Sequence, residues 1–204
     1  MLRYAVGVST GNGRLAREVL APGMFVALIL TSNFALADLP NVKFFDLLVF
    51  VAGYALGFRR GATVAVVAML AYEVANPWGP AGMALLLTKV GAEVVYAVAG
   101  AAARRLVRPE RVVLGPSRLS LLLVAAAVGS TLAYDLVTNL YTGWFWGSIA
   151  GGTEYARWIG VALVGPGALL FMALHIGSNA ALFPVFGPLL IKGADRVKQS
   201  LGWE

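Results

Sequence analysis

The stretch Asn41-Val-Lys-Phe-Phe-Asp-Leu-Leu-Val-Phe-Val-Ala-Gly-Tyr-Ala-Leu-Gly-Phe-Arg-Arg60, with the apolar run that follows it to Glu73-Val-Ala-Asn-Pro-Trp-Gly-Pro-Ala-Gly82, decides the fold. Two apolar segments meet at Arg59-Arg60, and a Pro/Gly-rich turn closes the second one. This pattern predicts a helical hairpin with a charged tip. If the hairpin only dipped into a bilayer, each arginine would cost at least ~2.5 kcal/mol at membrane depth. We therefore expect it to cross fully, with Arg59 and Arg60 in cytoplasmic water.

Composition sets the class of protein. Of the 204 residues, 59% are hydrophobic and 13% are charged, and the mean hydropathy is +0.79, whereas about 25% of residues are charged in soluble domains. The sequence therefore predicts a polytopic membrane protein. With no cysteine, the chain holds no disulfide and no thiolate metal site. Its pI is near 9.9, but the basic residues lie between apolar segments and not along one solvated face, so we expect no nucleic-acid partner.

The apolar segments predict an all-α fold with six transmembrane helices in a single domain, 1–204. The second and third are shorter than the ~20 residues that a lipid-facing span needs, so they reach full thickness with their flanks or border a thinned or protein-covered region. The predicted spans are Val19 to Ala37, Phe44 to Phe58, Gly61 to Ala75, Met83 to Ala103, Leu119 to Leu140, and Val164 to Ile191.

Lysine and arginine set the orientation, because they gather on the cytoplasmic side of membrane proteins. Of the sixteen, only Lys43 and Arg157 lie at the opposite ends of spans, and Lys89 lies inside one. Both termini are thus predicted to be cytoplasmic, as a tail over 1–18 and a tail over 192–204. The remaining basic residues are Arg3, Arg14, Arg17, Arg59, Arg60, Arg104, Arg105, Arg108, Arg111, Arg118, Lys192, Arg196 and Lys198.

The segment 141–163 is predicted to be a long external loop rich in aromatic side chains, among them Trp144 and Trp146. Such aromatics form either an interfacial belt or a lid over a ligand, and the sequence leaves both open. The Gly-rich run Gly7 to Arg14 lacks the Gly-Lys-Ser/Thr ending of a phosphate loop, so we expect no ATP hydrolysis by this chain.

Polar residues within the spans mark candidate functional positions, because an ionisable group in hydrocarbon is costly and is retained mostly against the bundle interior. Counted from the external ends, most of them lie in the outer half. A bundle that is polar outside and apolar inside is a cup and not a continuous pore. These residues are Asn33, Asp46, Glu73, Lys89, Glu93, Asp135, His175 and Asn179.

Two pairs are spaced i, i+4 and so share a helix face. Lys89 and Glu93 are expected either to neutralise one another or to exchange that contact for a ligand. Asp135 and Asn139 lie below the aromatic segment, where we expect ligand contact. Because acidic groups outnumber Lys89 in the outer half, the sequence favours a neutral or cationic ligand.

His175 and Asn179 show the same spacing on the last helix. The chain has one histidine and no cysteine, so we expect no metal site. A serine hydrolase with His175 and Ser178 is disfavoured, because the two side chains leave one helix nearly parallel. An intramembrane enzyme using Asp135 and Glu93 stays open as a weaker alternative; we expect no catalytic residues and no cofactor.

Several motifs resemble the substrate-binding S component of energy-coupling factor (ECF) vitamin transporters. They are the Asn-Val-Lys entry to the second helix, its Gly-Tyr-x-x-Gly exit onto basic residues, the Asn-Pro-Trp-Gly-Pro turn, Tyr134-Asp-Leu-Val-Thr-Asn139, His175-Ile-Gly-Ser-Asn-Ala-Ala-Leu-Phe183 and Phe186-Gly-Pro-Leu-Leu190. The resemblance implies a multi-pass protein of a prokaryotic plasma membrane that captures a vitamin or related precursor from outside. It also implies delivery through a transmembrane coupling subunit and two ATPase subunits in other chains.

The first helix carries small residues at every fourth position, Gly23, Ala27 and Thr31. Such a seam lets another helix approach closely, either inside this protein or in a partner. In S components a small-residue motif on this helix docks on the coupling subunit. The three positions match it in placement, although Thr31 departs from the usual alanine.

The predicted function is therefore substrate capture for an ECF-type importer. The alternative is a self-sufficient channel or carrier, in which Asp46, Glu73 and Asp135 would relay protons or cations. The predicted substrate-binding residues are Asn33, Asn76, Trp78, Lys89, Glu93, Asp135, Asn139, Trp144, Trp146, His175 and Asn179.

Overall fold

The computed structural model describes residues 16–200, and within them every regular element is helical. Most of the α-helices are connected by short turns, in keeping with an antiparallel bundle. Two short helical segments, η1 (Ala16–Leu20) and η2 (Pro109–Arg111), accompany them. The α-helices are α2 (Ala21–Ala35), α3 (Phe45–Leu56), α4 (Phe58–Val74), α5 (Met83–Leu106), α6 (Arg118–Ile149), α7 (Tyr155–Val164) and α8 (Pro166–Ser200).

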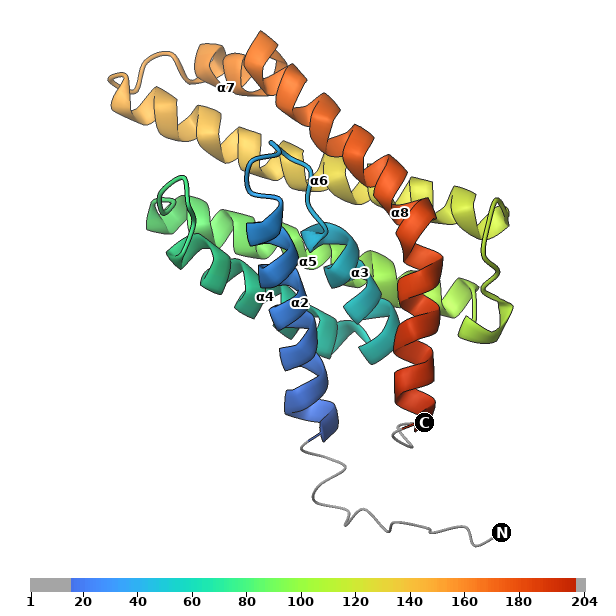
Figure 1. Cartoon of the computed structure of the whole chain (residues 1–204). Coiled ribbons are helices and arrows are strands. Elements are labelled where there is room, and N and C mark those ends of the chain that lie inside the picture. The colour runs from blue at the N-terminus through green and yellow to red at the C-terminus, as the bar shows by residue number, and fades with distance from the viewer. Residues whose placement is uncertain (1–15, 201–204) are drawn as a thin grey trace, which may run out of the picture.

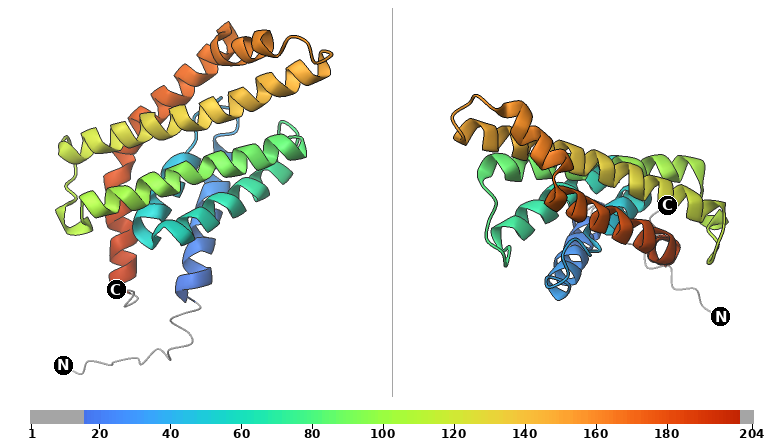
Figure 2. Two further views of the ribbon diagram at one scale, coloured as in Figure 1. Left: turned by 180° about the vertical axis from the view of Figure 1, so that it is seen from behind. Right: turned by 90° about the horizontal axis from the view of Figure 1, so that it is seen from above.

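The connections between helices gather at two opposite sides of the molecule. In Figures 1 and 2 the α2–α3, α4–α5 and α6–α7 connections lie on one side. The α3–α4 and α5–α6 connections lie on the other, together with the start of α2 and the end of α8. Successive connections between α2 and α7 therefore alternate between the two sides of the bundle.

Four helices of the described residues are long and apolar enough to cross a membrane: Glu18–Ala35, Met83–Leu106, Arg118–Ile149 and Pro166–Ser200. Their length and composition are compatible with a multi-pass membrane protein. The hairpin helices α3 and α4 have 12 and 17 residues, which is about 18 and 26 Å at 1.5 Å per residue. Both are shorter than the ~30 Å hydrocarbon core of a bilayer.

Helix α3 is the centre of the bundle, because its residues from Phe45 to Ala55 are all buried. Its fit against α5 depends on glycine. A Cβ on Gly100 would meet the backbone oxygen of Phe50, and a Cβ on Gly53 would meet that of Ala97. The two backbones therefore approach more closely than any side chain allows.

Helix α8 runs for 35 residues and contains Pro184 and Pro188. Proline removes a backbone donor and bends a helix, and α8 changes direction along its length (Figure 1). Its first half packs on α6 and α7, while its second half packs on α3. The same helix thus reaches both sides of the bundle.

The predicted external loop over 141–163 is mostly helical, which corrects that part of the sequence analysis. Helix α6 continues to Ile149, α7 follows, and only Ala150 to Glu154 link them. Glycine again explains the packing, since a Cβ on Gly143 would lie 2.5 Å from the Cα of Ile159.

The predicted tails overlap the described helices. Residues 16–18 begin η1, and 192–200 continue α8 as helix. The rest of both tails, 1–15 and 201–204, lies outside the described residues.

Candidate ligand-binding site

Two adjoining cavities open beside the α2–α3 connection. The first, of about 440 Å³, lies between α2, α4 and α5, and its wall includes Asn33, Glu73, Asn76, Trp78 and Lys89. Four of these were predicted to bind substrate. Glu73 was predicted as a polar residue within a span and as a proton or cation relay in the alternative carrier function, but not as a substrate-binding residue.

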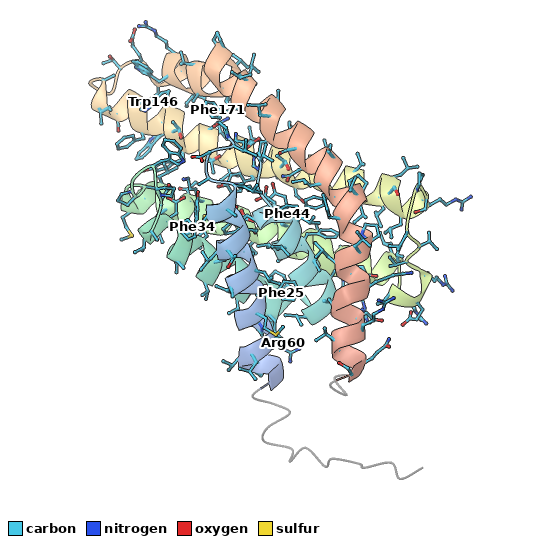
Figure 3. The ribbon with its side chains drawn as sticks, viewed as in Figure 1. Phe25, Phe34, Phe44, Arg60, Trp146 and Phe171 are labelled. Atoms are coloured by element: carbon cyan, nitrogen blue, oxygen red, sulfur yellow. The ribbon has the colours of Figure 1, made fainter. Side chains whose placement is uncertain are left out.

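The second cavity, of about 540 Å³, lies between α5, α6, α7 and α8. Its wall includes the predicted residues Asp135, Asn139, Trp146 and His175. Ligand pockets commonly measure 300–1,000 Å³, so each cavity suits a small organic molecule. Figure 3 shows Trp146 on α6 and Phe171 on α8 at this side of the bundle.

His175 joins two carboxylates from different helices. Its Nδ1 lies 2.8 Å from Oδ1 of Asp135 on α6, and its Nε2 lies 2.8 Å from Oδ2 of Asp46 on α3. Two ionised carboxylates only accept hydrogen bonds, so both bonds form when the imidazole is protonated and donates from each nitrogen. Because all three side chains are buried, this chain of bonds fixes α3, α6 and α8 to one another.

Asn179 extends this network away from the cavities. Its Nδ2 donates to Oδ2 of Asp46 at 2.7 Å and to Oγ1 of Thr131 at 2.9 Å. The Tyr96 hydroxyl donates to Thr131 at 3.0 Å. Asn179 lines neither cavity, so its predicted contact with substrate is replaced by a role in holding Asp46 in place.

Lys89 does not pair with Glu93 as the helix spacing predicted. Its Nζ lies 2.9 Å from Oε1 of Glu73 on α4. Glu93 lies one turn farther into the core and is fully buried, and neither of its carboxyl oxygens has a hydrogen-bond partner among the described residues. The long lysine side chain reaches the neighbouring helix, where the cavity leaves room for it, and Glu93 lines neither cavity.

Lys43 lies on the wall shared by both cavities. Its Nζ is 3.8 Å from Oδ1 of Asp46 and lies 5.6 Å from the centre of the Tyr134 ring. Burial has the largest single effect and lowers the pKa of this ammonium, but Asp46 together with Tyr134, Glu93 and Tyr72 outweighs it, and the net pKa is raised. Lys43 therefore carries a positive charge in the site. From sequence, Lys43 is expected only as a charge flanking a span, although its i, i+3 spacing to Asp46 indicates a contact between them.

The α2–α3 connection is tied down over the cavities by Asn41, whose φ is 55°. Its Nδ2 donates to the backbone oxygen of Phe171 at 2.9 Å, and its own backbone oxygen accepts from the Ser178 hydroxyl at 2.7 Å. Few residues other than glycine adopt this conformation, and asparagine is one that does. Ser178 is thus engaged in holding the connection on α8.

Trp144 was predicted to bind substrate, but the structure places its side chain outside both cavities. It is 52% exposed and lines neither cavity. Trp146, two residues on, faces the second cavity, and its ring lies 6.0 Å from that of Trp158 on α7. Side chains on one helix separated by two residues point in different directions, so only one of the pair faces the ligand site.

The predicted docking seam lies on the exposed surface of α2. Gly23, Ala27 and Thr31 are all exposed on α2, and a Cβ on Gly23 would have no neighbour within 4 Å. The alternative that this seam packs inside the protein is therefore wrong.

Among residues 16–200, no group of three or more His, Cys, Asp or Glu side chains is placed to hold a metal ion. Asp46, His175 and Asp135 are joined by hydrogen bonds. Comparison of the whole sequence and structure with protein-family models, curated proteins and solved structures found no match.

Proposed function

We propose that this protein captures a small organic molecule, of the vitamin or vitamin-precursor type, outside a prokaryotic cell. In this proposal α2, α3, α4, α5, α6 and α8 cross the plasma membrane with both termini in the cytoplasm. The molecule is delivered by a separate transmembrane coupling subunit and two ATPase subunits, as in ECF importers. The resemblance of the sequence motifs to S components supports this choice of partners.

The observation that carries the proposal is a set of buried acceptors in the cavity walls. Oδ1 of Asn33, Oε2 of Glu73 and Oδ2 of Asp135 have no hydrogen-bond partner among the described residues. The first two belong to the first cavity and the third to the second. A buried polar atom without a partner costs about 1–3 kcal/mol, and a ligand with N–H or O–H donors removes that cost.

The inner half of the bundle supports capture over free passage. Below the polar network the core is filled by apolar side chains, and Leu47, Phe50, Leu123 and Phe183 are fully buried there. The rings of Phe50 and Phe183 lie 5.2 Å apart. A ligand that enters from the outer side therefore meets a closed floor.

The exposed surface of α2 supports docking on a coupling subunit. Beside the exposed seam of Gly23, Ala27 and Thr31, an apolar groove of about 310 Å³ runs between α2, α3 and α8. Its wall includes Met24, Leu28 and Leu189, which are more than half exposed. Close approach of a second helix to small residues is how membrane helices associate.

The alternative is a proton-coupled carrier, and one observation favours it. Asp46, His175 and Asp135 form a continuous chain of ionisable groups, and such chains serve as proton relays in membrane carriers. Asp135 and His175 line the second cavity, so a proton taken up there would reach Asp46.

A flux experiment separates the two functions. The purified chain is placed in liposomes, and the ultrafiltered small-molecule fraction of yeast extract is added outside with and without a proton gradient. For a capture subunit, the purified chain retains a molecule from the extract but the liposomes accumulate none of it. Accumulation driven by the gradient would establish the carrier instead. If the chain retains no molecule and none accumulates, both functions fail.

A further inference from the structure

The two cavities meet at a common wall that contains both of their lysines. Asn41, Lys43, Lys89, Tyr134 and Phe171 line each cavity. A molecule that extends from one cavity into the other must pass these side chains. The chemistry of this wall therefore decides what part of a ligand lies there.

The acidic groups around the wall are already engaged within the protein. Glu73 accepts from Lys89 at 2.9 Å. Asp46 and Asp135 each bond the same imidazole at 2.8 Å. Each of the three carboxylates thus has a cationic or potentially cationic partner at hydrogen-bond distance.

Lys43 differs, because its ammonium has no hydrogen bond to any of the described residues. Asp46 lies at 3.8 Å, beyond hydrogen-bond distance, and Oδ2 of that carboxylate is taken by His175 and Asn179. The side chain of Lys43 is only 22% exposed. An ammonium offers three donors, and because Lys43 pairs with Asp46 only at 3.8 Å, these donors are available to an acceptor on a ligand.

Nearby rings keep the Lys43 ammonium in position without using its donors. Nζ lies 5.8 Å from the centre of the Phe45 ring and 5.6 Å from that of Tyr134, within the range of cation–π attraction. These contacts hold the charge at the wall and leave its N–H groups free to turn toward a ligand.

We propose that the captured molecule carries an anionic group, a carboxylate or a phosphate, and that Lys43 binds this group at the wall between the cavities. The proposal rests on the proposed capture function and replaces the neutral or cationic ligand that the sequence alone favoured. The rest of the molecule carries N–H or O–H donors for Asn33 and Glu73 on one side or Asp135 on the other, whose acceptor atoms lack partners among the described residues. Lys89 adds positive charge next to Lys43 while it keeps its bond to Glu73.

The test uses the full chain purified in lipid nanodiscs and exposed to the ultrafiltered small-molecule fraction of yeast extract. Native mass spectrometry gives the masses of the retained molecules and of their fragments. The affinity of each identified molecule is then measured by titrating it into the protein. The variants are Lys43→Gln, Lys43→Arg and the matched control Lys192→Gln, whose lysine lies near the far end of α8. Thermal unfolding without extract verifies that each variant is folded.

We expect the parent and Lys192→Gln to retain a molecule that contains a carboxylate or phosphate. Lys43→Gln should bind it at least about tenfold more weakly, since a hydrogen bond to a charged group contributes roughly 1.5–3 kcal/mol, and Lys43→Arg should recover part of the loss. A retained molecule without an anionic group overturns the inference but leaves the capture function standing. Equal binding of the anion by Lys43→Gln overturns the role of Lys43. Retention of nothing overturns capture and the inference together.

Discussion

Asp46 and His175 lie 129 residues apart in the chain, yet Oδ2 of Asp46 is 2.8 Å from Nε2 of His175, and both side chains are almost completely buried. The bond joins the central helix α3 to α8. Together with Asp135 on α6, it places three helices around one ring, so the ring has a structural role as well as a place on the cavity wall.

Replacing His175 by Ala should destabilise the protein strongly. Asp46 and Asp135 would lose their common partner, and breaking a buried charge pair typically costs about 3–5 kcal/mol. Thermal unfolding in detergent measures the effect. The control is Leu174→Ala, at an exposed neighbouring position, which should change the midpoint little. Equal thermal unfolding midpoints for the two variants would show that the imidazole does not stabilise the packing of α3, α6 and α8.

Asp135→Asn should weaken binding of the molecule retained from yeast extract by about 1.5–3 kcal/mol if Oδ2 accepts from a charged group, and by less if the donor is neutral. The amide oxygen still accepts from His175, so the fold should persist. Thr142→Val is the control on the same wall, because the Thr142 hydroxyl is already bonded to the backbone oxygen of Thr138 at 2.8 Å. Titration that gives Asp135→Asn the parent affinity would remove Asp135 from the site.

Gly100→Ala should prevent close packing of α3 on α5, because the added methyl would meet the backbone oxygen of Phe50. Backbone does not move aside as a flexible side chain does, so we expect a loss of at least about 1–3 kcal/mol. Gly129→Ala on α6 is the matched control, since its methyl meets nothing within 4 Å and should stabilise the helix by about 0.5–1 kcal/mol. Similar unfolding midpoints for both variants would contradict the close approach.

Ala27→Trp should abolish uptake in cells that contain the coupling module while the purified variant still binds its ligand. Ala27 is exposed on α2, so the indole should not disturb the bundle but should block a helix docking there. Ala102→Trp, at an exposed position on α5, controls for the added bulk. The seam would lose its proposed role if Ala27→Trp transported normally.

Cysteines placed at the tips of two connections should react from opposite sides of the membrane. The glycines in these connections, Gly61 and Gly79, are unsuitable for replacement by cysteine. A Cβ on Gly61 would lie 2.6 Å from the Cα of Gly53, and Gly79 has a φ of 95° that disfavours side chains. Phe58→Cys and Pro80→Cys use exposed positions beside them. We expect a membrane-impermeant maleimide added outside to label only Pro80→Cys. Labelling of both from outside would contradict the proposed topology.

The helical class could be predicted from sequence because apolar runs and their charged ends are local properties of the chain. Helix α7 was missed because Tyr155 to Val164 is short, and its close contact with Gly143 and Gly147 of α6 is not visible in the sequence. The i, i+4 rule led to Glu93 as the partner of Lys89, but the rule does not include α4, which supplies Glu73. Long-range pairs of this kind arise only once helices pack.

In the candidate site, too, the contacts between helices could not be predicted from local sequence patterns. Asp46 and His175 were each recognised as costly polar residues in a span, which depends on residue type alone. Their bond, and the position of Lys43 between two cavities, depend on how α3, α6 and α8 cross. Trp144 and Trp146 looked equivalent in the sequence, and only the direction of α6 separates them.

His175 is the one histidine in all 204 residues. Selective ¹⁵N-histidine labelling would therefore give the spectrum of a single imidazole, with no assignment problem. Since that ring touches one cavity and bonds to two other helices, its two nitrogen resonances form a built-in reporter. A molecule entering the second cavity and a rearrangement of α3 would each be recorded by the same pair of signals.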